Sequence, residues 1–368
     1  MFLPAGSQDQ IGEKLNNQAH VNQMFRTVVQ RRDYKAIETP VVEYAETFTN
    51  PHVGMDFSKL LKWFDREGEI EVLRPDWTTA IARALMKQHR SQLKWFYQGS
   101  IFRQDKNGIE SRQAGIEIIR TDALLGEMES LFTAVDFLST LSIDNYMIEL
   151  GHTGIFEYLT TPLELDEKEE GLLRSAMHDK KKDVVYRLVL EKGHEEIAEQ
   201  LVTLTQAFGG ISVLDDYMEK WQDVHELKEI VCLLKKLFNA LEELGDIDVT
   251  VDLGRVRQLP YYSGTMFRGY LTNSGEICFS GGRYDKLYKQ FNQNISAVGL
   301  AFDVDQLAKI IEPQLEAKRL CIVASPNTHI KAEKMRRDYP ECRVDIQYEV
   351  PQVGEYDQII NLANEVTG

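Results

Sequence analysis

The spacing of apolar residues near the start of the chain predicts a long amphipathic helix. Leu15, Ala19, Phe25 and Val29 recur at roughly helical intervals, and the positions between them are mostly polar. A helix with a single apolar face is expected to pack that face against a core. We therefore expect an amphipathic helix over residues 11–32.

Alternating apolar and polar positions, and apolar runs between turn residues, predict the strands of a sheet. These strands are expected at residues 36–44, 69–73, 95–103, 113–119, 247–253, 261–271 and 276–279, and from residue 297 onward. Pro40 places the first of them near a sheet edge, because proline has no backbone N–H to donate. Gly281 and Gly282 predict a turn, and Thr78 and Thr79 are candidate N-caps of a helix that runs to about residue 89.

Two stretches differ in composition from this sheet-forming part. Residues 158–245 are highly charged, contain few glycines and carry repeated apolar pairs, which predicts a helical insertion interrupted by a loop at Gly209 and Gly210. The tail of about fifty residues is small for an independent domain. Its strand, helix and second strand are expected at residues 319–324, 328–337 and 342–348. The expected organisation is a core of residues 1–157 and 246–317, a helical insertion at 158–245 and a short α/β segment at 318–368.

The overall composition restricts the class of protein. With 368 residues, of which 43% are apolar and 27% charged, the chain is long enough for one large core and one or two smaller units. Its net charge of -16 argues against a nucleic acid as the main ligand, because nucleic acids bind largely through cationic phosphate contacts. The N-terminus lacks a basic start followed by an apolar run, and no uncharged apolar stretch reaches membrane-spanning length. We therefore expect a cytoplasmic protein without membrane contact.

Short motifs exclude several kinds of chemistry. The four cysteines are far apart, without a CxxC pair or a histidine at zinc-ligand spacing, so we expect reduced cysteines, no bound metal and no cofactor. The sequence contains no P-loop, GxSxG, HExxH or GxGxxG motif. Val213–Asp216 begins like the ribose-phosphate segment of a phosphoribosyltransferase but lacks the Thr-Gly loop. This difference favours an acid pair near a helix N-terminus.

Several segments follow one another in the order of landmarks of histidyl-tRNA synthetase, over about the first 310 residues. Pro4–Asp9, the long helix and Glu38–Glu43 resemble class II motif 1, the helix and strand that form the dimer. Leu73–Thr79 reads LRPDWTT and is similar to the family's LRPEGT segment, whose acid and threonine hold the amino group of histidine. The resemblance implies that role for Asp76 and Thr78, since an ammonium group needs carboxylate and hydroxyl acceptors. A helix cap would explain Thr78 equally well.

Two later regions extend the resemblance. Gly99–Arg103 and Gln113–Glu117 resemble motif 2, whose arginine meets the carboxylate of the amino acid and the α-phosphate of ATP. Taken by itself, Arg103 could equally be a surface arginine on a strand. Arg257–Gly264 reads RQLPYYSG and is similar to the RGLDYY signature of histidyl-tRNA synthetase, with the GGRYD run Gly281–Asp285 after it. Without these neighbours, paired tyrosines would indicate core packing. The resemblance implies a histidine pocket in which Glu117, Tyr262 and Tyr284 contact the imidazole. The residues that it implies for the whole pocket are Asp76, Thr78, Arg103, Gln113, Glu117, Arg257, Tyr261, Tyr262 and Tyr284.

Other positions depart from the synthetase pattern where ATP and tRNA would bind. Gln306 stands where class II enzymes carry an ATP-binding arginine, and Asp303 replaces a glycine and adds negative charge beside the expected triphosphate. The motif 2 loop, residues 104–112, is short, and Pro260 replaces the acid of the histidine signature. The tail is about half as long as the family's anticodon-binding domain. These departures predict that histidine is bound without being activated.

One subfamily with this profile is the regulatory subunit of short-form ATP phosphoribosyltransferase, a synthetase paralogue without the anticodon domain. The resemblance implies an α+β fold of the class II aminoacyl-tRNA synthetase type, with an antiparallel sheet flanked by helices. It also implies a non-catalytic subunit that forms a dimer, assembles with the short-form catalytic subunit in the first step of histidine biosynthesis, and responds to histidine. A divergent histidyl-tRNA synthetase and a stand-alone histidine sensor remain as alternatives.

Overall fold

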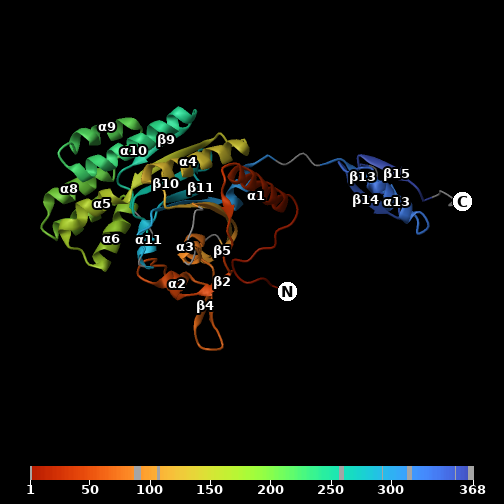
Figure 1. Cartoon of the computed structure of the whole chain (residues 1–368), viewed down its shortest axis with the longest axis horizontal. Helices are drawn as coiled ribbons and strands as arrows, with labels where there is room; N and C mark the ends of the chain where they lie inside the picture. Colours follow the sequence, from red (N-terminus) through yellow and green to blue (C-terminus); the bar gives the residue numbers. More distant parts are fainter. Residues whose placement is uncertain are drawn as a thin grey trace. The chain divides into compact units, whose positions relative to one another are not determined.

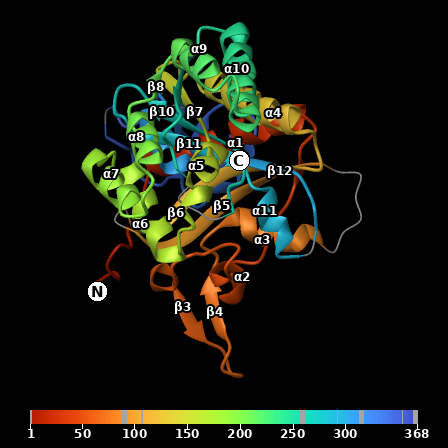
Figure 2. The same cartoon turned by 90° about the vertical axis from the view of Figure 1, so that its left-hand side faces the viewer.

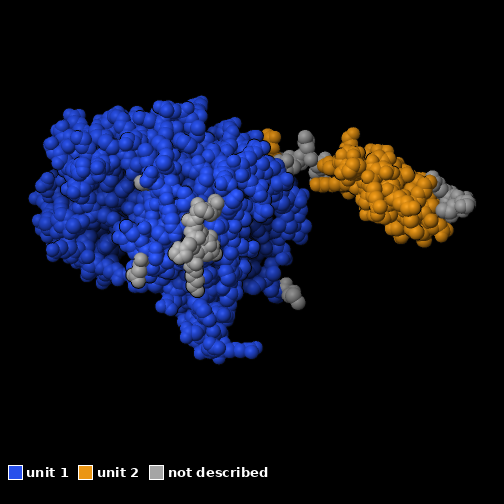
Figure 3. All heavy atoms as spheres, viewed as in Figure 1, with its two compact units in different colours: residues 1–311 blue, residues 312–368 orange. Residues whose placement is uncertain are grey.

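The computed structural model describes residues 2–86, 93–105, 108–256, 261–291, 293–312, 317–352 and 354–363. The chain divides into two compact units, residues 1–311 and 312–368, which have different colours in Figure 3. The first unit contains the landmarks from the sequence and is built around one large sheet. The second unit has a small sheet of its own.

The large sheet has nine strands within the described residues, in the order β1-β5-β6-β12-β11-β10-β7-β9-β8. Their bounds are β1 (Lys35–Ala36), β5 (Lys94–Asp105), β6 (Gly108–Ile119), β7 (Tyr146–His152), β8 (Phe208–Gly209), β9 (Asp248–Asp252), β10 (Thr265–Leu271), β11 (Ile277–Arg283) and β12 (Ala297–Asp303). Neighbouring strands pair antiparallel except β1 with β5 and β7 with β9, which are parallel. The predicted sheet and its β5–β6 hairpin are confirmed.

Helix α1 (Glu13–Arg31) packs on α4 (Ala123–Thr140) and on α12 (Val304–Ile310), and α4 and α12 pack on this sheet. Helices α1 and α4 are labelled in Figure 1. The amphipathic helix predicted at residues 11–32 is confirmed as α1. Its buried Phe25 meets Phe137 of α4 and Phe302 of β12 edge to face, with ring centroids 5.2 and 5.8 Å apart. Buried aromatic pairs in this orientation contribute about 0.5–1.5 kcal/mol each beyond the apolar area they bury.

The helices predicted within residues 158–245 are present and lie at the left of Figure 1. The elements of this region are α5 (Thr153–Thr160), the 3-10 helix η2 (Thr161–Leu163), α6 (Glu167–His178), α7 (Lys182–Leu190), α8 (Glu195–Leu204), α9 (Ile211–Lys220) and α10 (His225–Leu244). Apolar residues of α10, among them Leu234 and Leu241, belong to the same core as the sheet. The loop expected at Gly209 forms β8 in part, because Gly209 pairs with Val251 at the sheet edge. No helix of the described residues is long and apolar enough to cross a membrane.

The strand predicted at residues 36–44 is broken into two elements. β1 joins the large sheet, whereas β2 (Val42–Tyr44) joins β4 (Ile70–Leu73) and β3 (Lys62–Phe64) in a separate sheet that projects in Figure 2. The backbone oxygens of Thr39 and Pro40, between β1 and β2, accept hydrogen bonds from Nη1 of Arg74 at 2.8 and 3.3 Å. A buried guanidinium group therefore takes the place of a neighbouring strand there. The short helices α2 (Glu46–Thr49) and η1 (Phe57–Lys59) adjoin this sheet.

The turn predicted at Gly281 and Gly282 is wrong, because both residues lie inside strand β11. They pair with Leu300 and Gly299 of β12. A Cβ atom on Gly281 would lie 2.3 Å from the backbone oxygen of Gly299. The glycine pair therefore serves the close approach of neighbouring strands, which is the other common reason for glycine inside a strand.

The second unit consists of β13 (Arg319–Val323), α13 (His329–Arg336), β14 (Arg343–Gln347) and β15 (Gln358–Asn361). The first three elements confirm the prediction, and β15 is an addition. Its strands are parallel in the order β14-β13-β15. Leu320, Ile322, Ala332 and Leu362 form a separate small core with Ala324.

Candidate functional site

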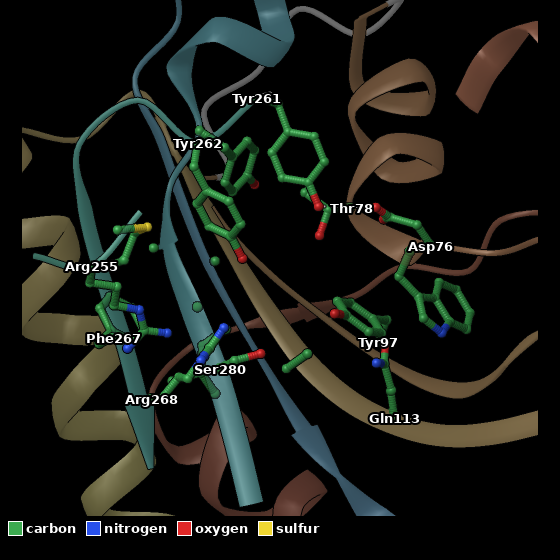
Figure 4. Close-up of a pocket in the computed structure, with 18 of the residues that line it drawn as sticks. Asp76, Thr78, Tyr97, Gln113, Arg255, Tyr261, Tyr262, Phe267, Arg268 and Ser280 are labelled. Carbon is green, nitrogen blue, oxygen red and sulfur yellow. Dashed lines mark hydrogen bonds between the residues drawn. The ribbon is translucent and has the colours of Figure 1, made fainter. Parts of the chain in front are cut away.

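A cavity of about 200 Å³ lies on the face of the large sheet opposite α1 and α4. Successive residues of a strand point to opposite faces. Ser280 and Ala301 line the cavity, whereas their neighbours Phe279 and Phe302 belong to the core beneath α1 and α4. Figure 4 shows the lining side chains converging on this hollow from several strands and from the start of helix α3 (Trp77–Met86).

The floor of the cavity is formed by small residues, namely Ser280, Gly282, Gly299 and Ala301. Gly282 pairs with Gly299 across β11 and β12. A Cβ on Gly282 would lie 2.4 Å from the backbone oxygen of Thr265, and a Cβ on Gly299 would lie 2.0 Å from Oε2 of Glu117. These two glycines therefore make room for a neighbouring strand and for a buried carboxyl group.

The structure brings most of the predicted pocket residues together. Those that line the cavity are Asp76, Thr78, Arg103, Gln113, Tyr261, Tyr262 and Tyr284. Glu117 is 1% exposed and is not part of the cavity wall, but it contacts two residues that are. Arg257 lies outside the described residues. Tyr284 immediately precedes the short helix α11 (Asp285–Lys289).

The carboxylate of Asp76 caps helix α3. Its Oδ1 accepts a hydrogen bond from the backbone N–H of Thr79 at 3.0 Å, and the hydroxyl of Tyr261 donates to Oδ2 at 3.2 Å. The prediction that Thr78 or Thr79 caps this helix is wrong, because α3 begins at Trp77 and both threonines lie inside it. The side chain of Thr78 is thereby available for a different partner.

That partner is the buried carboxyl group of Glu117. The hydroxyl of Thr78 donates to Oε1 of Glu117 at 2.7 Å, and the hydroxyl of Tyr284 donates to Oε2. Burial raises the pKa of Glu117 to about 8, more than these hydrogen bonds lower it. Glu117 is therefore mostly protonated at neutral pH and fixes the direction of two hydroxyl groups that face the cavity.

Trp77 stands where the synthetase pattern has glycine, and the structure shows how its indole is accommodated. The side chain is 2% exposed and stacks on Tyr97 with ring centroids 4.9 Å apart. The guanidinium carbon of Arg74 lies 3.4 Å from the centre of the indole ring. A Cβ on Gly99 would lie 2.8 Å from the indole. Glycine in β5 therefore leaves the space that Trp77 occupies.

Two arginines that were not predicted from the sequence form another wall of the cavity. Arg255 and Arg268 line it on the side away from Asp76 and Thr78 (Figure 4). Arg255 forms an ion pair with Glu149 of β7. Burial and the neighbouring positive charge of Arg268 lower the pKa of Arg255. An arginine at an alternating position within an otherwise apolar strand was the available signal for Arg268.

The positions that depart from the synthetase pattern in motif 3 have structural partners. Asp303 caps α12, with its Oδ1 accepting from the backbone N–H of Gln306 at 2.9 Å. Burial raises the pKa of Asp303. The side-chain oxygen of Gln306 accepts from Nζ of Lys309 at 3.0 Å. Neither residue belongs to the cavity wall.

Other candidate features do not form sites in the described part of the chain. Asp215 and Asp216 lie in helix α9, as predicted, but the expected position near the helix N-terminus is wrong, because α9 begins at Ile211 and its first turn contains no acidic residue. Among the described residues, no group of three or more His, Cys, Asp or Glu side chains could hold a metal ion. The four cysteines are free.

The comparisons with known proteins agree on one family and fold. Residues 6–307 match the family model described as histidyl-tRNA synthetase. An ATP phosphoribosyltransferase regulatory subunit of Bacillus cereus is 32% identical over 90% of this chain and 82% of its own length. A structure titled as an ATP phosphoribosyltransferase regulatory subunit/histidyl-tRNA synthetase from Bacillus halodurans has a TM-score of 0.84 at 23% identity, with 99% of each chain covered.

A histidyl-tRNA synthetase from Nostoc has a similar fold, with a TM-score of 0.79 at 16% identity over 96% of this chain and 87% of that one. These two structural likenesses confirm the predicted α+β fold of the class II synthetase type.

Proposed function

Because this chain belongs to the histidyl-tRNA synthetase family, and within it to the ATP phosphoribosyltransferase regulatory subunits, we propose that it regulates an ATP phosphoribosyltransferase in histidine biosynthesis. The proposed partner is the short-form catalytic subunit, which condenses ATP with phosphoribosyl pyrophosphate. In this proposal the chain is a non-catalytic cytoplasmic subunit, with a dimer of itself at the centre of a hetero-oligomer.

The effector in this proposal is free histidine, bound in the cavity. The observation that supports it is the distribution of charged and polar groups around the cavity. The cavity volume of about 200 Å³ is below the roughly 300–1,000 Å³ of pockets for drug-sized ligands, so a ligand smaller than these is expected. Asp76 and Thr78 offer oxygen acceptors on one side. Arg103 and Gln113 offer donors in the same wall. A zwitterionic amino acid needs both kinds of group.

The hydroxyl groups of the cavity suit an imidazole ring. A protonated Glu117 carboxyl has one proton for its two oxygens, so one of the Thr78 and Tyr284 hydroxyls donates to it and keeps an acceptor oxygen toward the cavity, and the other can accept the carboxyl proton. An imidazole N–H or an ammonium group can donate to such acceptors. Glu117 then acts through Thr78 and Tyr284 rather than by contact with the ligand.

Binding without adenylation is part of the proposal. Activation of histidine would require a cation for the triphosphate of ATP. The ATP-binding arginine of class II enzymes is replaced at position 306 by a neutral glutamine, whose side-chain oxygen accepts a hydrogen bond from Lys309. Asp303 adds a partly buried carboxyl group nearby. Histidine would instead bias the complex between two conformations, which requires that the two conformations bind histidine with different affinities.

The test measures ATP phosphoribosyltransferase activity of the short catalytic subunit from the same organism, with and without this chain, across a histidine titration. We expect activation by the chain and inhibition as histidine rises. Asp76→Asn keeps an oxygen for the cap of α3 but removes the charge, so the half-inhibitory histidine concentration should rise about tenfold or more. Tyr262→Phe, which removes a hydroxyl group from the cavity wall, should also raise this concentration, and Tyr158→Phe, at an exposed tyrosine of α5, is its matched control.

Other outcomes point to the alternatives. If the chain leaves the activity of the catalytic subunit unchanged but binds histidine by calorimetry, it is a separate histidine sensor. Formation of histidyl-adenylate from histidine and ATP would identify a divergent synthetase. Inhibition that is equally sensitive to histidine in wild type and Asp76→Asn would place the histidine site elsewhere.

A further inference from the structure

Two guanidinium groups lie near a single carboxylate at one end of the cavity, and only one of them is paired with it. Glu149 of β7 and Arg268 of β10 are directly opposite each other in the strand register. Directly opposed residues of antiparallel strands are close enough to form a pair. The Glu149 carboxylate is nevertheless bound by Arg255, and the two paired side chains are only 11% and 8% exposed.

Arg268 is left with an excess positive charge. Within the described residues no carboxylate lies at ion-pair distance from it, and its hydrogen bond is to the Tyr270 hydroxyl, 3.4 Å from Nη1. The positive charge of Arg268 also contributes to lowering the pKa of Arg255, which shows that the two cations are close enough to repel each other. Like charges in a partly buried place are unfavourable unless an anion lies near them.

A second cavity adjoins this arginine pair. Its volume is about 230 Å³, and Arg255, Val256 and Arg268 line both this cavity and the first one. Lys180 and Asp252 also line it and neutralise each other across 3.2 Å. Arg255 is likewise paired with Glu149. Of the lysine, arginine, aspartate and glutamate side chains that line the second cavity, Arg268 is the one whose charge is not neutralised by an ion pair with another described residue.

The sign of this excess is opposite to that of the whole chain, whose net charge is -16. A cation kept between two cavities of an acidic protein indicates a negatively charged ligand, because arginine forks bind oxyanions through paired N–H donors. The guanidinium group of Arg255 comes from the segment after β9, whereas the guanidinium group of Arg268 and the hydroxyl group of Tyr270 come from β10, so the donors can reach different oxygens of one group. A tetrahedral oxyanion offers more acceptor oxygens to such donors than a planar carboxylate does.

From this geometry we propose that the junction of the two cavities, at Arg255 and Arg268, is a binding site for a phosphate group. The group is either free phosphate or the phosphate of a monoester whose remainder occupies the second cavity. The site goes beyond the proposed histidine function, because the proposed histidine contacts on the other side of the first cavity are not needed for it.

The test is calorimetric titration of the full chain, without histidine and in a low-salt zwitterionic buffer, with inorganic phosphate and with ribose 5-phosphate as a monoester probe. We expect saturable binding of at least one probe. Arg268→Gln should weaken it about tenfold or more, as expected when one charge-assisted contact is lost. Arg187→Gln makes the same change of charge at an exposed residue of α7 and should leave the affinity unchanged.

A second variant separates binding from a purely structural role of the cluster. Glu149→Gln removes the carboxylate that competes for Arg255, so phosphate should bind more tightly and should raise the melting temperature more than it does in wild type. Stronger binding of ribose 5-phosphate than of phosphate supports a monoester ligand, and equal affinities support free phosphate.

The proposal is overturned if neither probe binds at millimolar concentration. It is also overturned if Arg268→Gln and Arg187→Gln have equal affinities, or if Glu149→Gln weakens binding while the protein stays folded by circular dichroism. Because histidine is absent from every titration, these results are independent of whether histidine regulates the partner enzyme.

Discussion

Glu117 gives the chain a pH-dependent stability whose size follows from its burial. The folded pKa is about 8, against 4.5 for an unperturbed glutamate. Well below pH 4.5 the carboxyl group is protonated in both the folded and the unfolded chain, so its ionisation does not change the free energy of unfolding there. Between these values the unfolded chain ionises and the folded chain does not, so the free energy of unfolding falls by about 1.4 kcal/mol per pH unit. The loss reaches about 5 kcal/mol, as an order of magnitude, by pH 8 and then levels off.

Glu117→Gln tests this value because glutamine has the same shape and does not titrate. One of the Thr78 and Tyr284 hydroxyls can still donate to its side-chain oxygen, and the other can accept from its amide NH2 group. We expect the variant to lose this part of the pH dependence, so that its stability relative to wild type improves steadily from pH 5 to pH 8. Glu191→Gln, at an exposed glutamate, is the matched control and should follow wild type.

The assay is urea unfolding at fixed pH values between 5 and 9, followed by tryptophan fluorescence. All four tryptophans, Trp63, Trp77, Trp95 and Trp221, lie in the first unit, so the signal reports on the unit that contains Glu117. Parallel stability curves for wild type and Glu117→Gln over this range would refute the reasoning. They would mean that Glu117 is ionised in the folded protein.

Two further substitutions test packing around the site. Nε and Nη2 of Arg283 each lie 3.0 Å from a carboxylate oxygen of Glu127, which is fully buried, so Arg283→Met should destabilise the first unit by about 3–5 kcal/mol in urea unfolding. Adding Glu127→Met should recover most of that loss, and no recovery would contradict the assignment to an unpaired charge. Trp77→Ala should cost about 3–5 kcal/mol by the same assay, because it removes a side chain that is 2% exposed. A loss below about 1 kcal/mol would show that the indole is not packed as described.

The helices and strands that bury one face in the large core could be predicted from the sequence, because their apolar residues recur at regular intervals. The apolar face of α1 and the alternation in β5 and β6 were sufficient, because both patterns extend over several turns or residue pairs. Short segments with two physical explanations were predicted less well. A glycine pair is compatible with a turn or with close strands, and Gly281 and Gly282 proved to need the latter. A threonine pair at a helix start is compatible with a cap, which Asp76 supplies instead.

The candidate pocket shows the same division. Its motifs placed seven of the named residues in the cavity wall, because residues that follow strand ends and alternate along strands of one sheet meet on one face. Periodicity could mark Arg268 as a polar residue in an apolar strand, but it could not show that Arg255 is its neighbour. The two arginines come together only in the folded protein, at the strand β10 and the segment after β9. The competition of two arginines for Glu149 depends on distances between three separate segments.

The sequence by itself determined the fold class, the helical insertion and the presence of a synthetase-like set of polar residues, because these depend on repeated local patterns and on motif order. The tertiary structure decided which hydroxyl meets which carboxyl group, why Glu117 is protonated and where positive charge is left uncompensated. These properties depend on burial and on contacts between residues far apart in the chain. The 39 positions between Thr78 and Glu117 become a distance of 2.7 Å only in the folded protein.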